Sequence, residues 1–444
     1  MCLREDIMRV SLTGDSIVFR RLNSMSDPTC RSLFDKIRAC DVSFTNLEML
    51  PSNFEGDPVF DHGGSHFSAR PWVLDDLSEA GFSLFAAATN HSLDYGVAGV
   101  RSALDCLEQR QILFAGVGRT LEAARRPAYA THPKGTVAMI SCCSTFARGQ
   151  EASDQTCSMQ GRPGLNPLRH KRRFVVTPDD MAALQGIHER VGLARIKEQQ
   201  VRLGFEYAPP DGVLPFAGLD FVTGDSCRME TIPDERDMQD IERWTREADI
   251  VSDVVVVSLH THDVGYGDDG AISWETPAAF VEEFARRMID AGADIVVCHG
   301  QHLLKGLEIY NGKAIFYGLG NFIGQNELIE ALPRESYEFY KVPLETTTHM
   351  VYRARTENDR KGFPADRRFW ETILPVCQFD AHKGLSAIEI HPVSLGLGKA
   401  AHKRGVPFLA EKDEAASILR RFESLSGRYG THFQNKGTFS LVSL

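Results

Sequence analysis

The hydrophobic pattern of the chain consists of short apolar runs separated by amphipathic stretches of helical length. The apolar residues within these runs are continuous rather than alternating, which is typical of strands that are buried on both faces. Strands that alternate with helices in this way predict an α/β fold with a sheet covered on both sides. The predicted strands lie within residues 9–15, 40–48, 81–91, 135–144, 252–260, 293–299 and 313–321.

The clearest helix signal lies at residues 275–292. Thr276 is predicted as the N-cap, Pro277 as the first helical residue and Gly292 as the stop signal. Residues 181–200 predict a polar helix, and residues 411–430 predict a C-terminal helix. The apolar stripe of the first helix comprises Phe280, Val281, Phe284, Met288 and Ile289.

The length of 444 residues allows two average domains or one large α/β domain with insertions. Two stretches, residues 146–216 and 326–380, interrupt the strand–helix rhythm. We predict one domain spanning residues 1–444, in which these stretches are insertions or lids. Hydrophobic residues make up 43% of the chain and charged residues 25%, which predicts a packed core rather than disorder.

Charge and cysteine content narrow the classes of partner. The net charge of −11 argues against nucleic-acid binding, which needs a clustered positive excess. No run approaches the roughly 18 apolar residues of a transmembrane helix, so no membrane association is expected. The ten cysteines show no CxxC pair, which favours a reduced, cytoplasmic location. The sequence leaves the oligomeric state open, a homo-oligomer included.

The predicted strands end in residues that bind metals or transfer protons. In open α/β sheets, ligands bind beyond the carboxyl ends of the strands, where several loops converge. Carboxylate, amide and imidazole donors without a sulfur-rich set suit one or two divalent cations from the group Ca, Mn, Zn and Fe. The predicted metal ligands are Asp15, Glu48, Asn90, His260 and His302.

Other residues near these strand ends suit substrate binding or proton transfer. His91 is predicted to face the substrate, and Asp94 either orients its imidazole or caps a helix. His262 is a metal ligand or a loop residue, and both interpretations stay open. Tyr317 and Asn321 are expected to shape the floor of the pocket.

The basic run at residues 162–174 has two interpretations. Such a run is usually a solvated loop, but on an acidic protein it also suits the docking of an acidic peptide or polymer. Arg169 and Arg172 are the candidate contacts for this docking.

Several motifs resemble those of CapA-type proteins, a family named for poly-γ-glutamate capsule synthesis and related in fold to calcineurin-like metallophosphoesterases. The resemblance covers most of residues 9–145, 217–325 and 385–430, and it implies a four-layer α/β/β/α core with a metal centre at the strand ends. The motifs, in order, are LTGD, TNLE, TNHSLDYG, SLH, HGQHLLKGLEIYNGKAIFYGLGNF and IEIHPVSLGLG.

The resemblance also implies a role for each matching residue. Asp15 and Glu48 match the first two acidic positions, with Glu48 placed to bridge two metals. His91 matches the histidine that handles protons beside the metal. The implied ligands are Asn90, His260 and His299 for one site and His302 for the other.

The sequence departs from the phosphoesterase pattern at two motifs. The histidine of the expected Asp-x-His motif is replaced by Ile17, and the expected Gly-Asp motif is replaced by Asn-Leu-Glu at residues 46–48. These changes put in doubt the two-metal clamp needed for phosphoryl displacement. Phosphatase activity is therefore not expected.

We derive three functional hypotheses. The first is a metal-dependent peptide epimerase, as in the lasso-peptide branch of the family (MslH-type), acting on the C-terminal residue of a precursor peptide. Inversion needs an acid/base group on each face of the α-carbon, and His91, His299 and Asp15 are the candidates, with His299 favoured over His302. The alternative is a hydrolase or transferase acting on a γ-glutamyl or other amide. The third is a non-enzymatic protein that binds a peptide or polymer.

Overall fold

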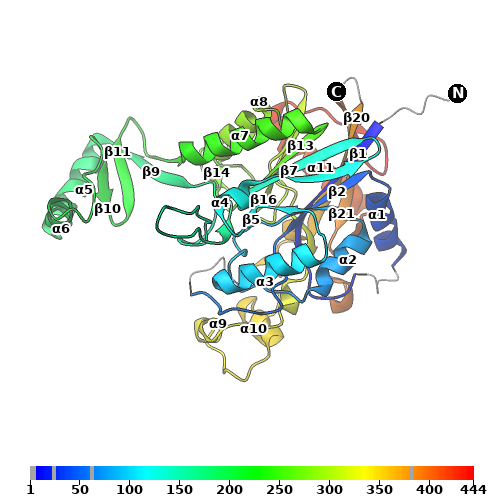
Figure 1. Ribbon diagram of the computed structural model, residues 1–444, viewed down its shortest axis with the longest axis horizontal. Helices are drawn as coiled ribbons and strands as arrows, with labels where there is room; N and C mark the ends of the chain where they lie inside the picture. Colours follow the sequence, from blue (N-terminus) through cyan, green and yellow to red (C-terminus); the bar gives the residue numbers. More distant parts are fainter. Residues whose placement is uncertain (1–6, 23–26, 61–64, 381–383) are drawn as a thin grey trace.

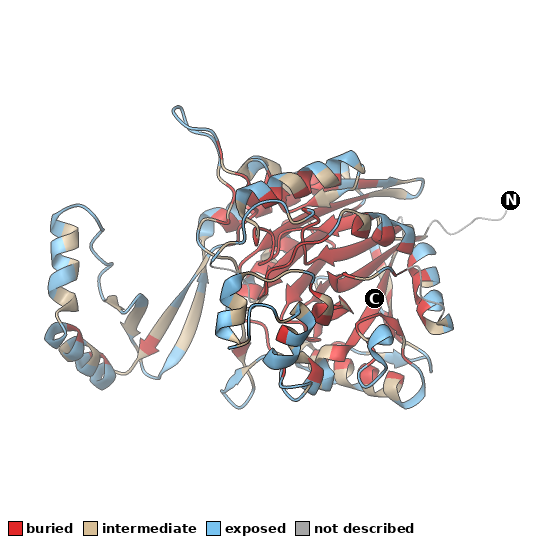
Figure 2. Ribbon diagram, turned by 90° about the horizontal axis from the view of Figure 1, so that it is seen from below, coloured by how far each residue is buried: buried red, intermediate tan, exposed pale blue. Residues whose placement is uncertain are grey.

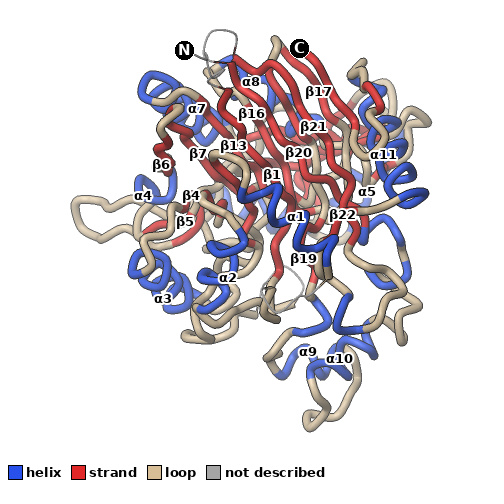
Figure 3. Tube along the Cα trace, turned by 90° about the vertical axis from the view of Figure 1, so that its right-hand side faces the viewer, coloured by secondary structure: helices blue, strands red, loops and turns tan. Residues whose placement is uncertain are grey.

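Two β-sheets lie face to face at the centre of the computed structural model, which describes residues 7–22, 27–60, 65–380 and 384–444 (Figures 1 and 3). The ten-stranded sheet runs in the order β23 (Gln434–Asn435), β24 (Ser440–Ser443), β21 (Gly384–Ser394), β20 (Glu371–Asp380), β1 (Ile7–Ile17), β2 (Val42–Leu47), β3 (Leu84–Ala86) and β4 (Phe114–Ala115), with β19 (Asn321–Gly324) beside β1 and β22 (Phe408–Leu409) beside β21. The six-stranded sheet runs in the order β17 (Leu307–Tyr310), β18 (Lys313–Phe316), β16 (Ile295–Gly300), β13 (Val254–Thr261), β7 (Gly135–Cys143) and β6 (Ala128–His132).

Helices cover the outer face of each sheet and complete the predicted four layers. α1 (Pro28–Arg38) and α2 (Trp72–Ala80) pack on the ten-stranded sheet, while α7 (Glu235–Val251) and α8 (Ala279–Asp290) pack on the six-stranded sheet. α11 (Lys412–Ser426) contributes to the apolar core between the sheets. Burial is concentrated in the sheets (Figure 2). The α/β/β/α class is therefore confirmed.

The predicted strands and helices are largely confirmed, with one shifted boundary. Each of the predicted apolar runs contains a strand, and residues 411–430 contain α11. α8, however, begins at Ala279 with Ala278 as its N-cap, two residues later than predicted. The reason is that the Thr276 carbonyl accepts a hydrogen bond from the Gly265 N–H, which holds this residue in the loop. That loop carries the small hairpin of β14 (Gly265–Tyr266) and β15 (Ile272–Ser273).

An arm projects from the core (Figure 1); it begins inside the first irregular stretch but continues to Pro233, beyond the predicted end of that stretch at residue 216. Residues 181–200, predicted as one helix, form two helices separated at Gly192, whose φ of 83° favours glycine. Residues 146–169 instead remain with the core, where β8 (Gly164–Leu165) pairs with β5 (Val117–Gly118) near α3 (Gly96–Gln109) and α4 (Leu121–Arg125). The arm comprises β9 (His170–Val176), α5 (Pro178–Arg190), α6 (Leu193–Arg202), β10 (Leu214–Phe216), β11 (Leu219–Thr223) and β12 (Arg228–Pro233).

The base of the arm is held by a buried ionic cluster. Asp237 on α7 is fully buried and binds Arg125 at 2.6 Å and Arg169 at 2.7 Å. Two guanidinium groups on one buried carboxylate satisfy its charge and its hydrogen-bond capacity. Since Arg169 immediately precedes β9, the cluster fixes where the arm leaves the core.

The second irregular stretch is shorter than predicted. Residues 326–370 form short helices beside the strand ends, but Glu371–Asp380 is β20, which pairs with both β1 and β21. The predicted boundary at residue 380 is therefore wrong, because Pro375 made a central strand look irregular. None of the described helices is long and apolar enough to cross a membrane. The short helices are η1 (Asn326–Leu328), α9 (Arg334–Phe339), α10 (Thr348–Arg355), η2 (Phe363–Ala365) and η3 (Arg367–Trp370).

Candidate metal centre

The carboxyl ends of four parallel strands meet where the two sheets converge. In one sheet, Asp15 of β1 lies level with Asn46 of β2. In the other, His260 of β13 lies level with His299 of β16. Because parallel strands in register end at one edge, their last side chains converge there.

Asp15 is held as a buried carboxylate. It accepts hydrogen bonds from Asn46 Nδ2 at 2.8 Å and from the Gly300 N–H at 3.4 Å, and His302 Nδ1 lies 3.1 Å away. Burial opposes its ionisation, but the hydrogen bond to His302 and the nearby imidazoles outweigh this effect and lower the pKa of Asp15 below its usual range. The carboxylate is thus charged and available to a cation.

Glu48 provides the strongest sign of a metal site. It follows β2, is 0% exposed, and neither of its carboxylate oxygens has a hydrogen-bond partner among the described residues. Burial, together with Asp15 and Asp94, raises the pKa of Glu48 well above its usual value. A buried carboxylate without donors is strongly unfavourable unless a cation binds it. The donor set therefore fits a metal ion.

Two groups of donors share Glu48. The first comprises Glu48, His260 and His262, and the second comprises Asp15, Glu48 and His302; within each group the donor atoms lie within 4.8 Å of one another. Burial lowers the pKa of His262 to about 3 and that of His260 well below its usual value, so both rings are neutral and offer a lone pair. Such mixed carboxylate and imidazole sets suit divalent cations.

The turn from Gly300 to His302 has an unusual backbone that aims His302 at the carboxylates. His302 has a φ of 58°, which is uncommon for a residue other than glycine, and its Nδ1 lies 2.8 Å from Asn321 Oδ1. At Gly300, with φ 110°, a Cβ would lie 2.5 Å from the Thr261 carbonyl oxygen. The turn therefore requires glycine at position 300 and holds His302 in a strained backbone conformation.

A cleft of about 210 Å³ opens over these donors and is lined by His91, His262, Gln301, His302 and Arg355, among others. His91 Nδ1 lies 2.6 Å from Asp94 Oδ2, and the His91 ring packs against Phe67 with centroids 4.2 Å apart. Asp94 also accepts a hydrogen bond from the Phe67 N–H and does not cap α3. The contact with Asp94 leaves Nε2 of His91 as the nitrogen available for proton transfer.

Two predicted acid/base residues do not face this cleft. His299 is fully buried, stacks on Phe44 with centroids 5.5 Å apart, and lies 3.8 Å from Asp15. Burial lowers the pKa of His299 to about 4. Asp15 is equally buried and is engaged with Asn46 and His302. This burial argues against direct proton transfer to a substrate by His299 or Asp15, because a catalytic acid or base must reach the substrate, and both roles stay predictions.

The predicted substrate-binding residues are dispersed. Tyr317 lies on the far face of its sheet, where its hydroxyl donates to Glu308 at 2.6 Å, so its predicted place in the pocket floor is wrong. Asn321 positions His302 instead of forming a floor. Arg169 is taken up by Asp237, which argues against a docking role, whereas Arg172 lines a separate cavity at the base of the arm.

Three residues of the site were not predicted. Asn46, which contacts Asp15 and lies 3.3 Å from His260 Nδ1, sits two residues before Glu48 on the same strand face, so strand periodicity contains a signal for it. Gln301 and Arg355 lie in a turn and on a short helix, where no such period exists. Asn90 is buried in the turn that carries His91, and its role as a ligand stays a prediction.

The fold and these donors define a four-layer α/β/β/α protein with a candidate divalent-metal centre at the strand ends. The model of a family described as bacterial capsule synthesis protein PGA_cap matches residues 9–326. The chain belongs to this family.

Several known proteins are similar to the chain. The uncharacterized proteins y4sH and y4uA of Sinorhizobium fredii are each 32% identical, over 97% of this chain and 92% of their own length. The PGA biosynthesis protein CapA of Bacillus subtilis is 22% identical, over 72% of this chain and 64% of its own length. A solved Staphylococcus aureus structure described as a 5′-nucleotidase is 9% identical with a TM-score of 0.39, over 94% of this chain and 58% of its own, which is too distant to bear on function.

The substitution Glu48→Gln tests the metal centre, because it keeps the shape of the side chain and removes the charge shared by both donor groups. We expect plasma mass spectrometry to detect a divalent cation in the dialysed wild type and at least about tenfold less in the variant. Adding the cation to chelated protein should raise the melting temperature of the wild type only. The control is Glu308→Gln, a buried carboxylate held by Arg286 and Tyr317. Equal metal content in the wild type and Glu48→Gln would contradict the assignment.

Proposed function

We propose that the chain is a metal-dependent enzyme that hydrolyses or transfers an amide bond in a γ-glutamyl or related anionic substrate. The observation that supports it most is that two of the metal-type donors, His262 and His302, line one cleft together with His91, whose Nδ1 contacts Asp94. Membership of the capsule-synthesis family supports the choice of substrate. A Mycobacterium tuberculosis relative, 25% identical, carries the name of a probable polyglutamine synthesis accessory protein.

The donor set suggests which cation would bind. Glu48 would be shared, with His260 and His262 on one side and Asp15 and His302 on the other. Imidazole donors favour Zn, Mn or Fe, whereas Ca²⁺ prefers sites built from oxygen alone. When bound, the cation would polarise the substrate carbonyl and lower the pKa of water.

The other residues of the cleft would orient the substrate and move a proton. Asp94 holds Nδ1 of His91, so that Nε2 of His91 would protonate the leaving amine. Phe67 packs on the same imidazole and fixes the plane of the ring. Proton transfer by a held imidazole needs no rearrangement of the side chain during the reaction.

A positive charge at the mouth of the cleft supports an anionic substrate. Arg355, on α10, donates to Ser65 Oγ at 2.7 Å across the opening. No described carboxylate forms an ion pair with Arg355, and the carboxylates of Asp15 and Glu48 are fully buried. A guanidinium group placed in this way can bind a substrate carboxylate through two hydrogen bonds.

The reaction is tested with an oligomer of γ-linked glutamate, followed by mass spectrometry. We expect a metal-dependent change of mass that Asp94→Asn and His91→Ala reduce by about 10²–10⁴-fold, because they remove or misorient the proton donor. Both variants should keep their metal, and His402→Ala on an exposed loop should keep full activity. The absence of any metal-dependent mass change with γ-linked and α-linked glutamate would contradict the proposal.

The substitution Arg355→Met tests the recognition of a carboxylate. Loss of a charge-assisted hydrogen bond worth about 1.5–3 kcal/mol should raise KM by about ten- to a hundredfold, with little change in kcat. Arg353→Met provides the matched control, because Arg353 lies on the same helix and contacts Asn358 rather than the cleft. Equal increases of KM in the two variants would show that substrate binding depends on the net charge of the protein and not on the position of Arg355.

One observation favours a second candidate, the peptide epimerase. His91 and His302 come from different elements and line the same cleft, so two imidazoles could address opposite faces of an α-carbon. This mechanism replaces His299 by His302 as the second acid/base group.

The epimerase predicts α-deuterium incorporation when a peptide is incubated with the enzyme in D2O, and an altered stereocentre without a change of mass in H2O. His91→Ala should block proton exchange from one side only, because it leaves the imidazole of His302 in place. Hydrolysis without deuterium at the α-carbon would rule out the epimerase and leave the hydrolase.

A further inference from the structure

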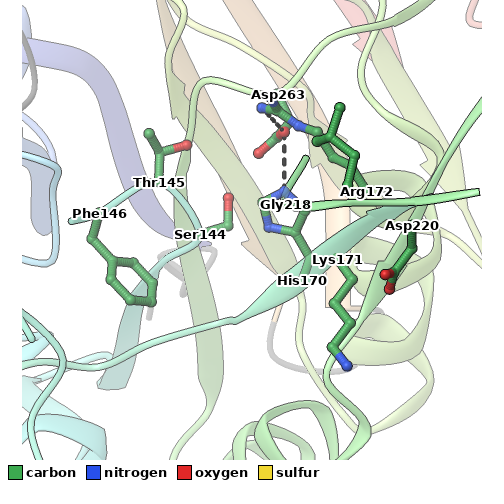
Figure 4. Close-up of a pocket in the computed structure, with 10 residues that line it drawn as sticks. Ser144, Thr145, Phe146, His170, Lys171, Arg172, Gly218, Asp220 and Asp263 are labelled. Atoms are coloured by element: carbon green, nitrogen blue, oxygen red, sulfur yellow. Dashed lines mark hydrogen bonds and ion pairs between the residues drawn. The ribbon is translucent and has the colours of Figure 1, made fainter. Parts of the chain in front are cut away.

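A cavity of about 520 Å³ lies at the base of the arm, outside the cleft of the metal centre (Figure 4). Its size falls in the range of ligand-binding sites. The core contributes residues 144–146 and Asp263 to its lining, and the arm contributes residues 170–172 and 218–220. The cavity therefore lies between two parts of the chain that are distant in sequence.

One wall of the cavity is an open strand edge. His170, Lys171 and Arg172 of β9 pair with β12 on one side. On the other side, β11 pairs with β9 only from Arg173 onward. A tight hairpin turn at Ala217 and Gly218 joins β10 to the start of β11. The φ values of these two residues, 51° and 81°, are typical of such a turn. Within the described ranges, three residues of β9 thus have no neighbouring strand on the side of β11.

The direction of the backbone groups follows from the hydrogen bonds at each end of β9. The Arg169 carbonyl accepts from Asp234 beside β12, and the Val176 carbonyl accepts from Gly224 beside β11. Because successive residues of a strand point their N–H and C=O groups to alternate sides, the N–H and C=O of His170 and the N–H of Arg172 face the open side, whereas the Arg172 carbonyl belongs to the ladder that pairs Arg173 with Asp220. An added strand could therefore form hydrogen bonds at this edge.

Two basic side chains, Lys171 and Arg172, and two carboxylates, Asp220 and Asp263, line the cavity, and it is the amine of Lys171 that favours an acidic ligand. Asp263 is already matched by His170 at 3.1 Å and by Arg172 at 2.8 Å. Lys171 extends away from Asp263 (Figure 4), and no described residue forms an ion pair or hydrogen bond with its amine. Asp220 also lines the cavity, but the guanidinium group of Arg172 remains 54% exposed. A carboxylate side chain beside Lys171 would balance this free charge.

The cavity adjoins the metal centre. His262 lines the cleft, and the next residue, Asp263, lines the cavity. The Ser144 N–H donates to the His260 carbonyl, and the His262 N–H donates to Thr145 Oγ at 2.8 Å. The core wall of the cavity thus supports the backbone of two candidate ligands.

We propose that this edge of β9 binds an extended α-peptide as an added strand, with an acidic side chain beside Lys171. A γ-linked polymer does not fit, because its amides are spaced more widely than the repeat of a β-ladder. Delivery of the bound peptide to the cleft rests on the proposed function, whereas the binding itself does not. The edge would hold the peptide while a neighbouring part of it enters the cleft.

The probe is a fluorescent, end-blocked peptide of alternating glutamate and valine, with binding followed by anisotropy on metal-loaded and on chelated full-length protein. Arg172→Pro removes the N–H that faces the cavity without breaking a bond to β12, and a strand tolerates proline where its N–H has no partner strand. Arg172→Ala removes the same side chain but keeps the N–H. We expect Arg172→Pro to raise Kd at least about tenfold more than Arg172→Ala does. Chelation should leave Kd unchanged.

Peptide analogues keep the test valid if Arg172→Pro fails to fold. N-methylation of the amides on one edge of the peptide should abolish binding, and N-methylation on the other edge should not. Replacing glutamate by lysine should weaken binding, and Lys171→Glu should reverse this preference. Equal binding of γ-linked glutamate, insensitivity to N-methylation, or self-association of the protein through this edge in sedimentation would overturn the proposal. Failure of the enzymatic assay alone would not, because binding is measured without metal.

Discussion

The burial of two carboxylates where the sheets converge is the constraint on which the site depends. Glu48 has no hydrogen-bond donor among the described residues, and Asp15 lies close enough to repel it. Ionising both carboxylates at close range is unfavourable unless a positive charge compensates them, and the raised pKa of Glu48 expresses this cost. The neutral imidazoles of His260 and His262 do not supply that charge. Metal binding and the stability of this part of the fold are therefore coupled.

The same constraint explains the backbone around the site. Gly14 of β1 has no room for a side chain, because a Cβ there would lie 1.8 Å from the Gly320 carbonyl oxygen. This close approach brings β19 beside β1 and places Asn321 within hydrogen-bond distance of His302. The positive φ of His302 is tolerated because Asn321 and Asp15 both contact Nδ1 of its ring and hold the ring in place. Strain at one residue is thus balanced by the packing of two strands.

The hydrophobic pattern predicted an α/β fold with a covered sheet and donors at the strand ends, whereas the four layers were implied by the family resemblance. Continuous apolar runs marked the strands, and the polar residue at the end of each run marked the metal centre. The burial of His299 was not predictable in this way. The alternation of side chains along a strand does not show whether another sheet covers them. His299 stacks on Phe44 of the opposite sheet, and only the packing of the two sheets reveals this contact. For the same reason Tyr317 looked like a pocket residue although it packs in the cluster that contains α8 and stacks on Tyr429.

The parts that the sequence did not predict are those in which distant segments meet. Arg355 reaches the cleft from a helix more than two hundred residues beyond His91, and no local pattern joins them. The open edge of β9 depends on where β11 begins after the turn at Ala217. That position is set by how the strands pair, and composition does not reveal it. The two arginines of the basic run that were predicted to dock a ligand make different contacts. Arg169 neutralises Asp237 and fixes the arm, which leaves Arg172 and Lys171 to define the charge of the cavity. A fixed arm keeps the open edge beside the metal centre, so recognition and chemistry are separated in sequence but adjacent in space.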